Sequence, residues 1–293
     1  MIAPDRIGRH RRGPLESARY ARDYARAYVA RERISRFIAT NVGDIRRAAE
    51  TAEAQVDGAG PTRVYMLWAQ SIDQAPEVVQ LCHEQLVRVH ARGEVVALDL
   101  EAARALVEIP AYVLHKTADD LAMLSDVLRL ELLARYGGVW ADATCLALDD
   151  LIARTRDQMP AGFFAFTRRD RPLASWFLAS EPGGYVVRMW KAAMHAYWQR
   201  FDHKIHYFVV HYLFEALCRH DAEFRRRWQE TPRVDADAAH AFQEAMHEPY
   251  EEARYRDLLG QSFIHKLTYR FEAGDARAET MLGHLLRHGA GSP

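Results

Sequence analysis

The chain has 293 residues, 49% of them hydrophobic, which suits one large α/β domain or one domain with a helical annex. Its formal net charge is −1, which argues against a protein that binds nucleic acid through a broad basic surface. No apolar run approaches the roughly 20 residues of a membrane span, and the amino-terminal segment lacks the apolar stretch of a secretory signal.

Three cysteines, Cys82, Cys145 and Cys218, lie far apart and in no metal-ligand spacing. Scattered cysteines in odd number are typical of reduced thiols in the interior of a cytosolic protein. We therefore expect a cytoplasmic protein.

The first predicted element is a long helix over residues 15–55. Tyr20, Tyr24 and Tyr28 recur every four residues at its start, and aliphatic residues continue the apolar stripe. One interpretation is a helix that packs on the domain through this aromatic stripe. The other is a basic amphipathic helix that touches an anionic membrane surface. The arginines of the preceding tail favour the second interpretation: Arg6, Arg9, Arg11 and Arg12.

A segment that contains glycine and proline, residues 56–62, separates this helix from the rest of the chain. We therefore expect an annex over residues 1–60, made of the basic tail and the long helix, and a main domain over residues 61–293. If the helix touches lipid, the protein would be peripheral to the inner face of the membrane.

Strands and helices alternate through the main domain. Predicted strands cover residues 63–68, 94–99, 139–143, 162–169 and 175–180, and predicted helices cover 75–93, 118–138 and most of 184–259. A further segment, residues 262–270, is expected to be a late strand or a loop. The alternation predicts a mostly parallel central sheet with helices on both faces.

Polar side chains gather around the predicted strand that ends near Asp142, and open α/β sheets bind ligands at such strand ends. Asp126 and Arg129 lie three residues apart on the preceding helix and share a face. Gly137 and Gly138 let the chain turn back sharply between helix and strand. We expect the three polar side chains to converge on one crevice. The alternative is a surface ion pair beside an Asp that caps a turn.

The segment SDVLRLELLARYGGVWADAT, which contains these residues, resembles the signature of the DxD sugar transferases of glycosyltransferase family 32. The likeness is closest to their capsular polysaccharide synthesis branch. Four further segments resemble that family in the same order: VYMLWAQSIDQAPEVVQLC, SWFLAS, YFVVHYLF and FIHKLTYR. The resemblance extends over residues 63–270 and does not cover residues 1–60.

The resemblance implies a GT-A type fold, a nucleotide-binding α/β sandwich. It also implies transfer of a sugar, with retention at the anomeric carbon, from a nucleotide-diphosphate donor to a saccharide or lipid-linked acceptor. A UDP-sugar is the favoured donor, and the reaction would serve the synthesis of a capsular or other surface polysaccharide. The leaving diphosphate needs its growing negative charge neutralised, and Mn²⁺ or Mg²⁺ is the expected cofactor.

By the same resemblance, three residues form the catalytic group. Asp126 would bind hydroxyls of the donor sugar or the ribose, Arg129 the donor sugar or phosphate, and Asp142 the ribose and the metal ion. Thr144 stands where the second Asp of the D-x-D element is expected, so a metal ion would be held more loosely or through water. His265 resembles a late metal ligand of several related enzymes, and a structural histidine is the alternative.

Four more residues are expected on the donor. Lys266 would neutralise the diphosphate, although it shares a site with its neighbour His265 only if their segment is a loop. Trp68 and Gln70 follow the first strand, and the ring of Trp68 would stack on the nucleobase unless it belongs to the core. Gly138 is the fourth residue expected at the donor.

On the acceptor side, Tyr207 and His211 lie four residues apart on one helix face. Two functions besides transfer stay open. The first is a catalytically inactive nucleotide-sugar-binding relative or scaffold protein, which the replacement of the second Asp by Thr144 would allow. The second is a nucleotide-sugar hydrolase, in which water is the acceptor.

Overall fold

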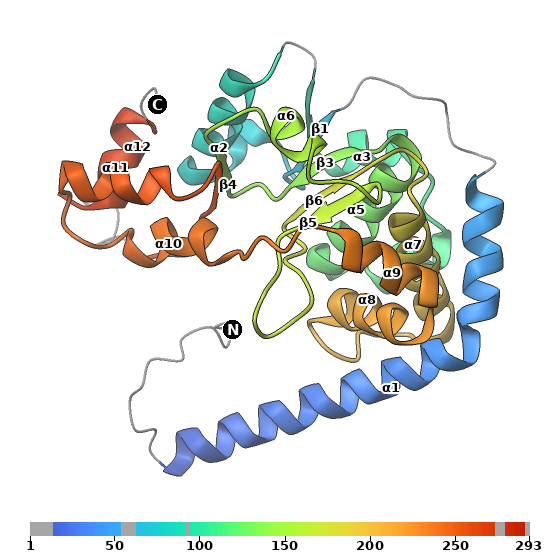
Figure 1. Cartoon of the computed structure of the whole chain (residues 1–293). Helices are drawn as coiled ribbons and strands as arrows, with labels where there is room; N and C mark the ends of the chain where they lie inside the picture. Colours follow the sequence, from blue (N-terminus) through green and yellow to red (C-terminus); the bar gives the residue numbers. More distant parts are fainter. Residues whose placement is uncertain (1–13, 54–62, 92–93, 273–278, 291–293) are drawn as a thin grey trace.

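The computed structural model describes residues 14–53, 63–91, 94–272 and 279–290. The predicted basic tail and the predicted boundary segment 56–62 lie outside the described residues. Figure 1 shows a central sheet with helices on both sides and one long helix that runs along the edge of the molecule.

The central sheet has five strands in the order β2-β1-β3-β6-β5. The strands are β1 (Val64–Leu67), β2 (Val95–Leu98), β3 (Gly138–Ala141), β5 (Phe163–Ala165) and β6 (Phe177–Ser180). Strand β1 pairs in parallel with β2 and β3, whereas β6 pairs antiparallel with β3 and β5. The sheet is therefore mixed, and the expected parallel arrangement holds for β2, β1 and β3. Strands β5 and β6 follow each other without an intervening helix, as antiparallel neighbours do.

A second, two-stranded sheet joins distant parts of the chain. Strand β4 (Cys145–Ala147) follows β3 closely and pairs antiparallel with β7 (Ile264–Lys266). The predicted late segment thus contains a strand, and β4 was not predicted. In the register, Cys145 lies opposite Lys266 and Leu146 lies opposite His265.

The helices surround both sheets. They are α1 (Pro14–Glu53), η1 (Ile72–Gln74), α2 (Glu77–Val89), α3 (Leu100–Leu106), α4 (Ala111–Lys116), α5 (Leu121–Tyr136), α6 (Leu151–Arg156), α7 (Tyr185–Arg200), α8 (Val209–His220), α9 (Ala222–Glu230), α10 (Asp237–Ala245), α11 (Glu252–Gly260) and α12 (Met281–His288). The predicted long helices correspond to α1, α2, α5 and the helices from α7 to α11. None of the helices in the described part of the chain is long and apolar enough to cross a membrane.

Both faces of the central sheet are buried, as expected for strands covered by helices on each side. Tyr65 and Trp140 point into a large apolar core that also includes residues of α1, α5, α7 and α8. Their neighbours Val64 and Val139 point into a second core on the other face. This period of two along β1 and β3 fixes which side chains reach each face.

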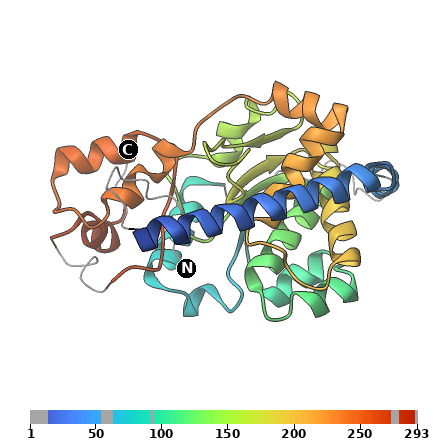
Figure 2. The ribbon, with the colours of Figure 1, turned by 90° about the horizontal axis from the view of Figure 1, so that it is seen from below.

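Helix α1 packs on α7 and α8 through aliphatic residues along its second half. Ile34, Ile38 and Ile45 are almost fully buried there. Tyr24 and Tyr28, in contrast, are 65% and 58% exposed, so the expected packing through the tyrosines is wrong for these two residues. Figure 2 shows α1 crossing much of the width of the molecule, with the carboxyl-terminal helices extending beyond its amino-terminal end.

Candidate functional site

A pocket of about 260 Å³ opens at the carboxyl ends of the neighbouring parallel strands β1 and β3. Residues from six parts of the chain line it, at the place where the strand-end rule for α/β sheets predicts a site. The structure brings together these predicted residues: Trp68, Asp126, Arg129, Asp142, Thr144, Tyr207, His211 and Lys266.

Arg129 lies at the base of the pocket between two carboxylates. Its Nη2 lies 3.2 Å from Oδ1 of Asp126 and 3.4 Å from Oδ1 of Asp142. The guanidinium also donates to the backbone oxygen of Ser175 at 2.6 Å and lies over the ring of Trp140, 5.1 Å from its centre. These contacts hold Arg129, which is only 5% exposed, in one orientation. The alternative of a solvated surface ion pair is therefore excluded.

Asp142 follows β3 directly and is held by the backbone on both sides. Its amide donates to the carbonyl of Trp176, and its carbonyl accepts from the amide of Cys145, both at 2.9 Å. Its carboxylate accepts a hydrogen bond from Nε1 of Trp140 at 2.9 Å. The side chain of Asp142 is 29% exposed. A fixed but partly open carboxylate is suited to bind a ligand.

Asp126 is buried beside this pair, with 6% of its surface exposed. Burial raises the pKa of its carboxyl from the ordinary 3.8 to about 6. The positive charge of Arg129 opposes this rise in pKa, and the negative charge of Asp142 adds to it. The three side chains therefore form one electrostatically coupled group.

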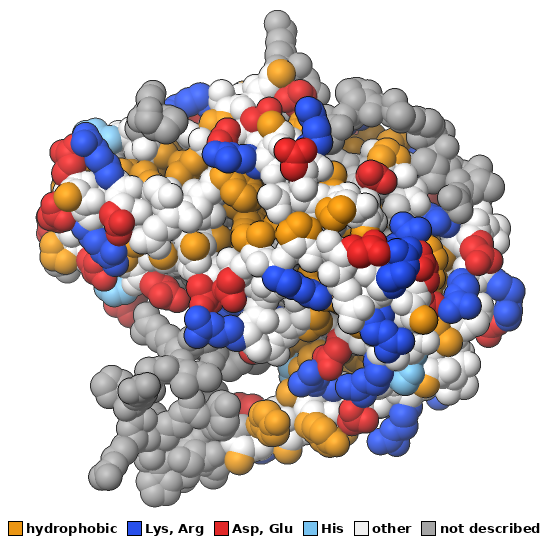
Figure 3. All heavy atoms as spheres, viewed as in Figure 1, with side chains coloured by type: hydrophobic (Ala, Val, Ile, Leu, Met, Phe, Trp, Pro, Cys, Tyr) orange, Lys and Arg blue, Asp and Glu red, His pale blue; other side chains and the backbone are white. Residues whose placement is uncertain are grey.

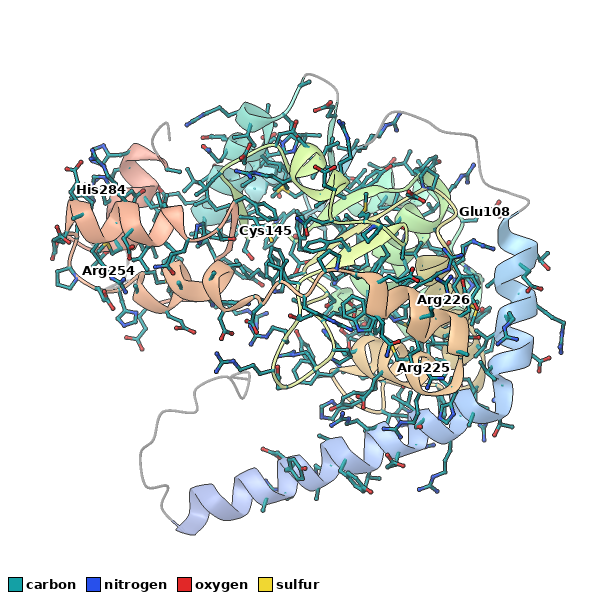
Figure 4. The ribbon with its side chains drawn as sticks, viewed as in Figure 1. Glu108, Cys145, Arg225, Arg226, Arg254 and His284 are labelled. Atoms are coloured by element: carbon teal, nitrogen blue, oxygen red, sulfur yellow. The ribbon has the colours of Figure 1, made fainter. Side chains whose placement is uncertain are left out.

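Thr144 and Lys266 meet at another wall of the pocket because β4 and β7 pair. Nζ of Lys266 donates to Oγ1 of Thr144, and the amide of Leu267 donates to the carbonyl of Thr144 at 2.8 Å. Figure 4 labels Cys145, the residue of β4 opposite Lys266, in the interior between the central sheet and the carboxyl-terminal helices. Thr144, which stands at the second Asp position of the predicted D-x-D element, is thus hydrogen-bonded to an ammonium group.

His265 does not share this pocket, contrary to the prediction that it binds metal beside Asp142. Successive side chains of a strand point to opposite sides, and Lys266 is the one that faces the pocket. His265 is fully buried, and its Nε2 lies 3.0 Å from the carbonyl oxygen of Leu259. Its ring contacts Phe242, so it is a core histidine.

Gly138 also lies elsewhere than predicted. It begins β3, at the end of the strand opposite Asp142, and does not line the pocket. Its φ is +94°, and a Cβ there would lie 2.3 Å from the carbonyl oxygen of Arg63, so only glycine fits. Gln70 is exposed beyond β1 and is likewise not among the lining residues.

Two aromatic rings form a corner at the mouth of the pocket. Trp68 and Tyr269 contact edge to face, with ring centres 5.3 Å apart, and both line the pocket. Tyr269 was not predicted as a site residue. The sequence signal for it was its place in the FIHKLTYR segment, three residues after Lys266.

His211, in the first turn of α8, and Tyr207, just before that helix, border the pocket. Tyr207 therefore lies outside the helix on which the sequence predicted both residues. Tyr207 is 58% exposed, whereas His211 is 6% exposed, and its Nδ1 has no hydrogen-bond partner among the described residues. Burial lowers the pKa of His211 well below its ordinary value, and the positive charges of Arg171, Arg129 and Arg168 add to this effect. His211 is therefore a neutral imidazole with one nitrogen unpartnered.

The side chains of the pocket do not fit the predicted metal site. Divalent cations such as Mg²⁺ take several oxygen or nitrogen ligands around one point. Among the described residues, no group of three or more His, Cys, Asp or Glu is arranged to hold a metal ion. Thr144 is bonded to Lys266, and His265 faces away, so two of the three predicted ligands are missing from such a set.

A larger cavity, about 920 Å³, lies between α1, α5 and α7, and none of the predicted site residues lines it. Its most buried acid, Glu131, is bonded to His195 and lies 3.3 Å from Nζ of Lys191. Glu131, His195 and Lys191 therefore pair with one another. The smaller pocket is therefore the candidate site.

Of the comparisons with known proteins, the family model identifies the family of this chain. A family model described as "Capsular polysaccharide synthesis protein" matches residues 17–285, which includes most of α1. No curated protein matches the sequence. Among solved structures, one described as "PaToxG Glycosyltransferase" is similar at a TM-score of 0.40 and 11% identity, covering 92% of this chain and 97% of that chain. A likeness at that level does not define the fold.

Proposed function

Because the chain belongs to the capsular polysaccharide synthesis protein family, we propose that it transfers a sugar from a nucleotide-diphosphate donor to a saccharide or lipid-linked acceptor. The observation that carries this proposal is the pocket at the ends of β1 and β3. It joins two carboxylates, two cationic side chains and an aromatic corner in about 260 Å³. A UDP-sugar is the expected donor, and a GT-A type fold is the expected class.

Each group of the pocket has a role toward such a donor. The aromatic corner of Trp68 and Tyr269 offers an apolar face to the nucleobase. Asp126 and Asp142 accept hydrogen bonds from hydroxyls of the sugar or ribose. Arg129 binds the sugar or phosphate, and its many contacts keep it oriented before the donor arrives.

In the reaction, the bond between the anomeric carbon and the diphosphate oxygen breaks, and its electron pair leaves with the diphosphate. An acceptor hydroxyl oxygen forms the new bond to that carbon, and its proton passes to the departing diphosphate. Retention of configuration follows from the sequence resemblance. Assays with and without metal test the requirement for Mn²⁺ or Mg²⁺ that was expected from the sequence.

The acceptor side of the pocket is assigned to His211 and Tyr207. The neutral imidazole of His211 has an unpartnered nitrogen, which suits a hydrogen bond to a hydroxyl group. Tyr207 is exposed at the rim, where aromatic rings bind the apolar faces of sugars. Tyr207 precedes α8 and His211 lies in its first turn, whereas the predicted donor ligands come from α5, β7 and the residues after β1 and β3.

A peripheral contact with an anionic membrane surface is the proposed location of the reaction. The exposed Tyr24 and Tyr28 of α1 support it, together with Arg22 and Arg26 on the same exposed stretch. Tyrosine rings and arginines are favoured at the boundary between headgroups and water. Figure 3 shows hydrophobic side chains along α1 at the lower edge of the molecule.

Thermal unfolding in the presence of UDP, GDP and their sugar conjugates, with and without Mn²⁺, tests the function. We expect at least one nucleoside diphosphate or its sugar conjugate to raise the Tm of the wild-type protein. A panel in which no nucleotide changes Tm would contradict the proposal. Hydrolysis of the donor that no saccharide or lipid-linked acceptor converts to transfer would identify a hydrolase instead.

A further inference from the structure

The departing nucleoside diphosphate carries negative charge that some group in the pocket must neutralise. A metal ion does this when carboxylates hold it beside the phosphates. Here the position of the second carboxylate is taken by Thr144, whose hydroxyl accepts a hydrogen bond from the ammonium of Lys266. The chain's own cation therefore lies where the sequence predicts a metal ligand.

Lys266 has no carboxylate partner among the described residues. Besides Thr144, its Nζ donates to the backbone oxygen of Leu267 at 3.3 Å, and both acceptors are uncharged. A half-buried ammonium group without a counter-ion is costly, because burial removes water and nothing negative replaces it. An anionic ligand in the pocket would supply that missing charge.

The side chain of Lys266 is also held in one orientation. Strand β7 sets its direction by pairing with β4, and Thr144 holds the tip of the side chain. Arg129 provides a second cation in the same pocket, fixed by Ser175 and by two carboxylates. Cations oriented before binding stabilise a leaving group without further rearrangement.

We infer that Lys266, with Arg129, takes the place of a divalent metal ion at the donor diphosphate, so that nucleotide binding and sugar transfer need no metal. This inference rests on the proposed function. In the transfer step, the electron pair of the broken bond between the anomeric carbon and the diphosphate oxygen goes to that oxygen. The ammonium of Lys266 donates a hydrogen bond to the diphosphate as its charge grows.

Calorimetric titration with UDP and GDP tests the inference, first in EDTA and then in Mn²⁺. For the wild-type protein, we expect the same Kd, within about threefold, in both conditions, because charge-assisted hydrogen bonds from the protein carry the phosphate contact. Lys266→Met should weaken the binding by on the order of tenfold or more in EDTA. Lys266→Arg, which keeps the charge, should restore part of the loss.

Two further variants make the test specific to this position. Thr144→Asp restores the second carboxylate, which would pair with Lys266 and compete with the diphosphate. Its binding of nucleotide in EDTA should therefore fall. Lys204→Met is the control, because Lys204 pairs with Asp120 and does not line the pocket. This control should bind as the wild-type protein does, and thermal unfolding of each variant verifies the fold.

The outcomes separate the inference from the function on which it rests. Binding of UDP or GDP only in Mn²⁺, with Lys266→Met unchanged, would overturn the inference and leave the sugar transferase intact. Absence of nucleotide binding in both conditions would overturn the proposed function and the inference together. Metal-independent binding that Lys266→Met weakens as expected would support the inference, and transfer assays in EDTA would then test the proposed function.

Discussion

At the scale of single residues, Asp142 is the side chain whose loss should affect chemistry most and folding least. Its carboxylate is partly exposed, and Asn keeps an oxygen able to accept from Nε1 of Trp140. We expect Asp142→Asn to lower the rate of sugar transfer by on the order of 10²-fold or more, because a charge beside the reacting groups is lost.

Release of nucleoside diphosphate from the donor measures this rate. Chemical denaturation should give Asp142→Asn a free energy of unfolding within about 1 kcal/mol of the wild-type value. A variant that retains at least a third of the wild-type rate would show that Asp142 is not in the catalytic group.

The raised pKa of Asp126 gives a second residue-scale prediction. The folded chain holds the proton of this carboxyl up to about pH 6, whereas the unfolded chain releases it near pH 3.8. This group therefore lowers the free energy of unfolding as pH rises through that window, by on the order of 3 kcal/mol in total. Asp126→Asn removes the effect, so the stability of the variant relative to the wild type should increase from pH 4 to pH 7.

Urea denaturation of both proteins at pH 4, 5, 6 and 7 measures this difference, and subtraction cancels the titration of other groups. A difference that stays constant over the four pH values would mean that the carboxyl of Asp126 titrates normally.

At the scale of elements, the Gly137-Gly138 turn places Asp142 by letting β3 start directly against β1. A Cβ on Gly138 would lie 2.3 Å from the carbonyl oxygen of Arg63, which accepts from the amide of Val139. We expect Gly138→Ala to destabilise the fold by roughly 2 kcal/mol or more, because the strand must shift away from its partner.

Gly260→Ala is the matched control, since nothing lies within 4 Å of a Cβ at this helical position. It should leave the free energy of unfolding unchanged or raise it by up to about 1 kcal/mol. Denaturant midpoints of the two variants test this prediction, and we expect the lower midpoint for Gly138→Ala. Equal midpoints would refute the steric argument.

Some side-chain directions in the site could be predicted from the sequence, and others could not. The i, i+3 spacing of Asp126 and Arg129 fixes their common face on any helix, so their convergence with Asp142 was predictable. The side to which His265 points was not, because it depends on whether its segment is a strand or a loop. That choice depends on pairing with β4, a strand of three residues that carries too little periodicity to be recognised.

The antiparallel direction of β6 could not be predicted from the sequence for a related reason. The segment between β5 and β6 contains no helical pattern, and its path decides whether the sheet is parallel there. Tyr269 was missed because a partly exposed aromatic ring acquires meaning only opposite Trp68, which lies about two hundred residues earlier.

At the scale of the whole molecule, α1 divides into a half that packs and a half that stays open. Ile34 and Ile38 are buried against α7 and α8, whereas Tyr24 and Tyr28 face solvent. We expect Tyr24→Ser combined with Tyr28→Ser to reduce sedimentation with vesicles that contain phosphatidylserine, without change in the free energy of unfolding, because these rings contact lipid instead of the core.

Val87→Ser is the control for this surface, because Val87 is a half-exposed apolar residue on α2 rather than α1. It should sediment with the vesicles as the wild-type protein does. Pure phosphatidylcholine vesicles should bind all three proteins weakly. Equal sedimentation of the double variant and the wild type on anionic vesicles would exclude this face of α1 from membrane contact.

The pairing of β4 with β7 has a consequence for the nascent chain during translation. Thr144 leaves the ribosome long before Lys266, its partner 122 residues later in the chain. Until that lysine emerges, a nascent chain has the carboxylates and Arg129 but lacks the second cation of the pocket. The ability to bind a nucleotide sugar therefore arises only after Lys266 has been synthesised, and a chain that terminates before this residue would not sequester the donor.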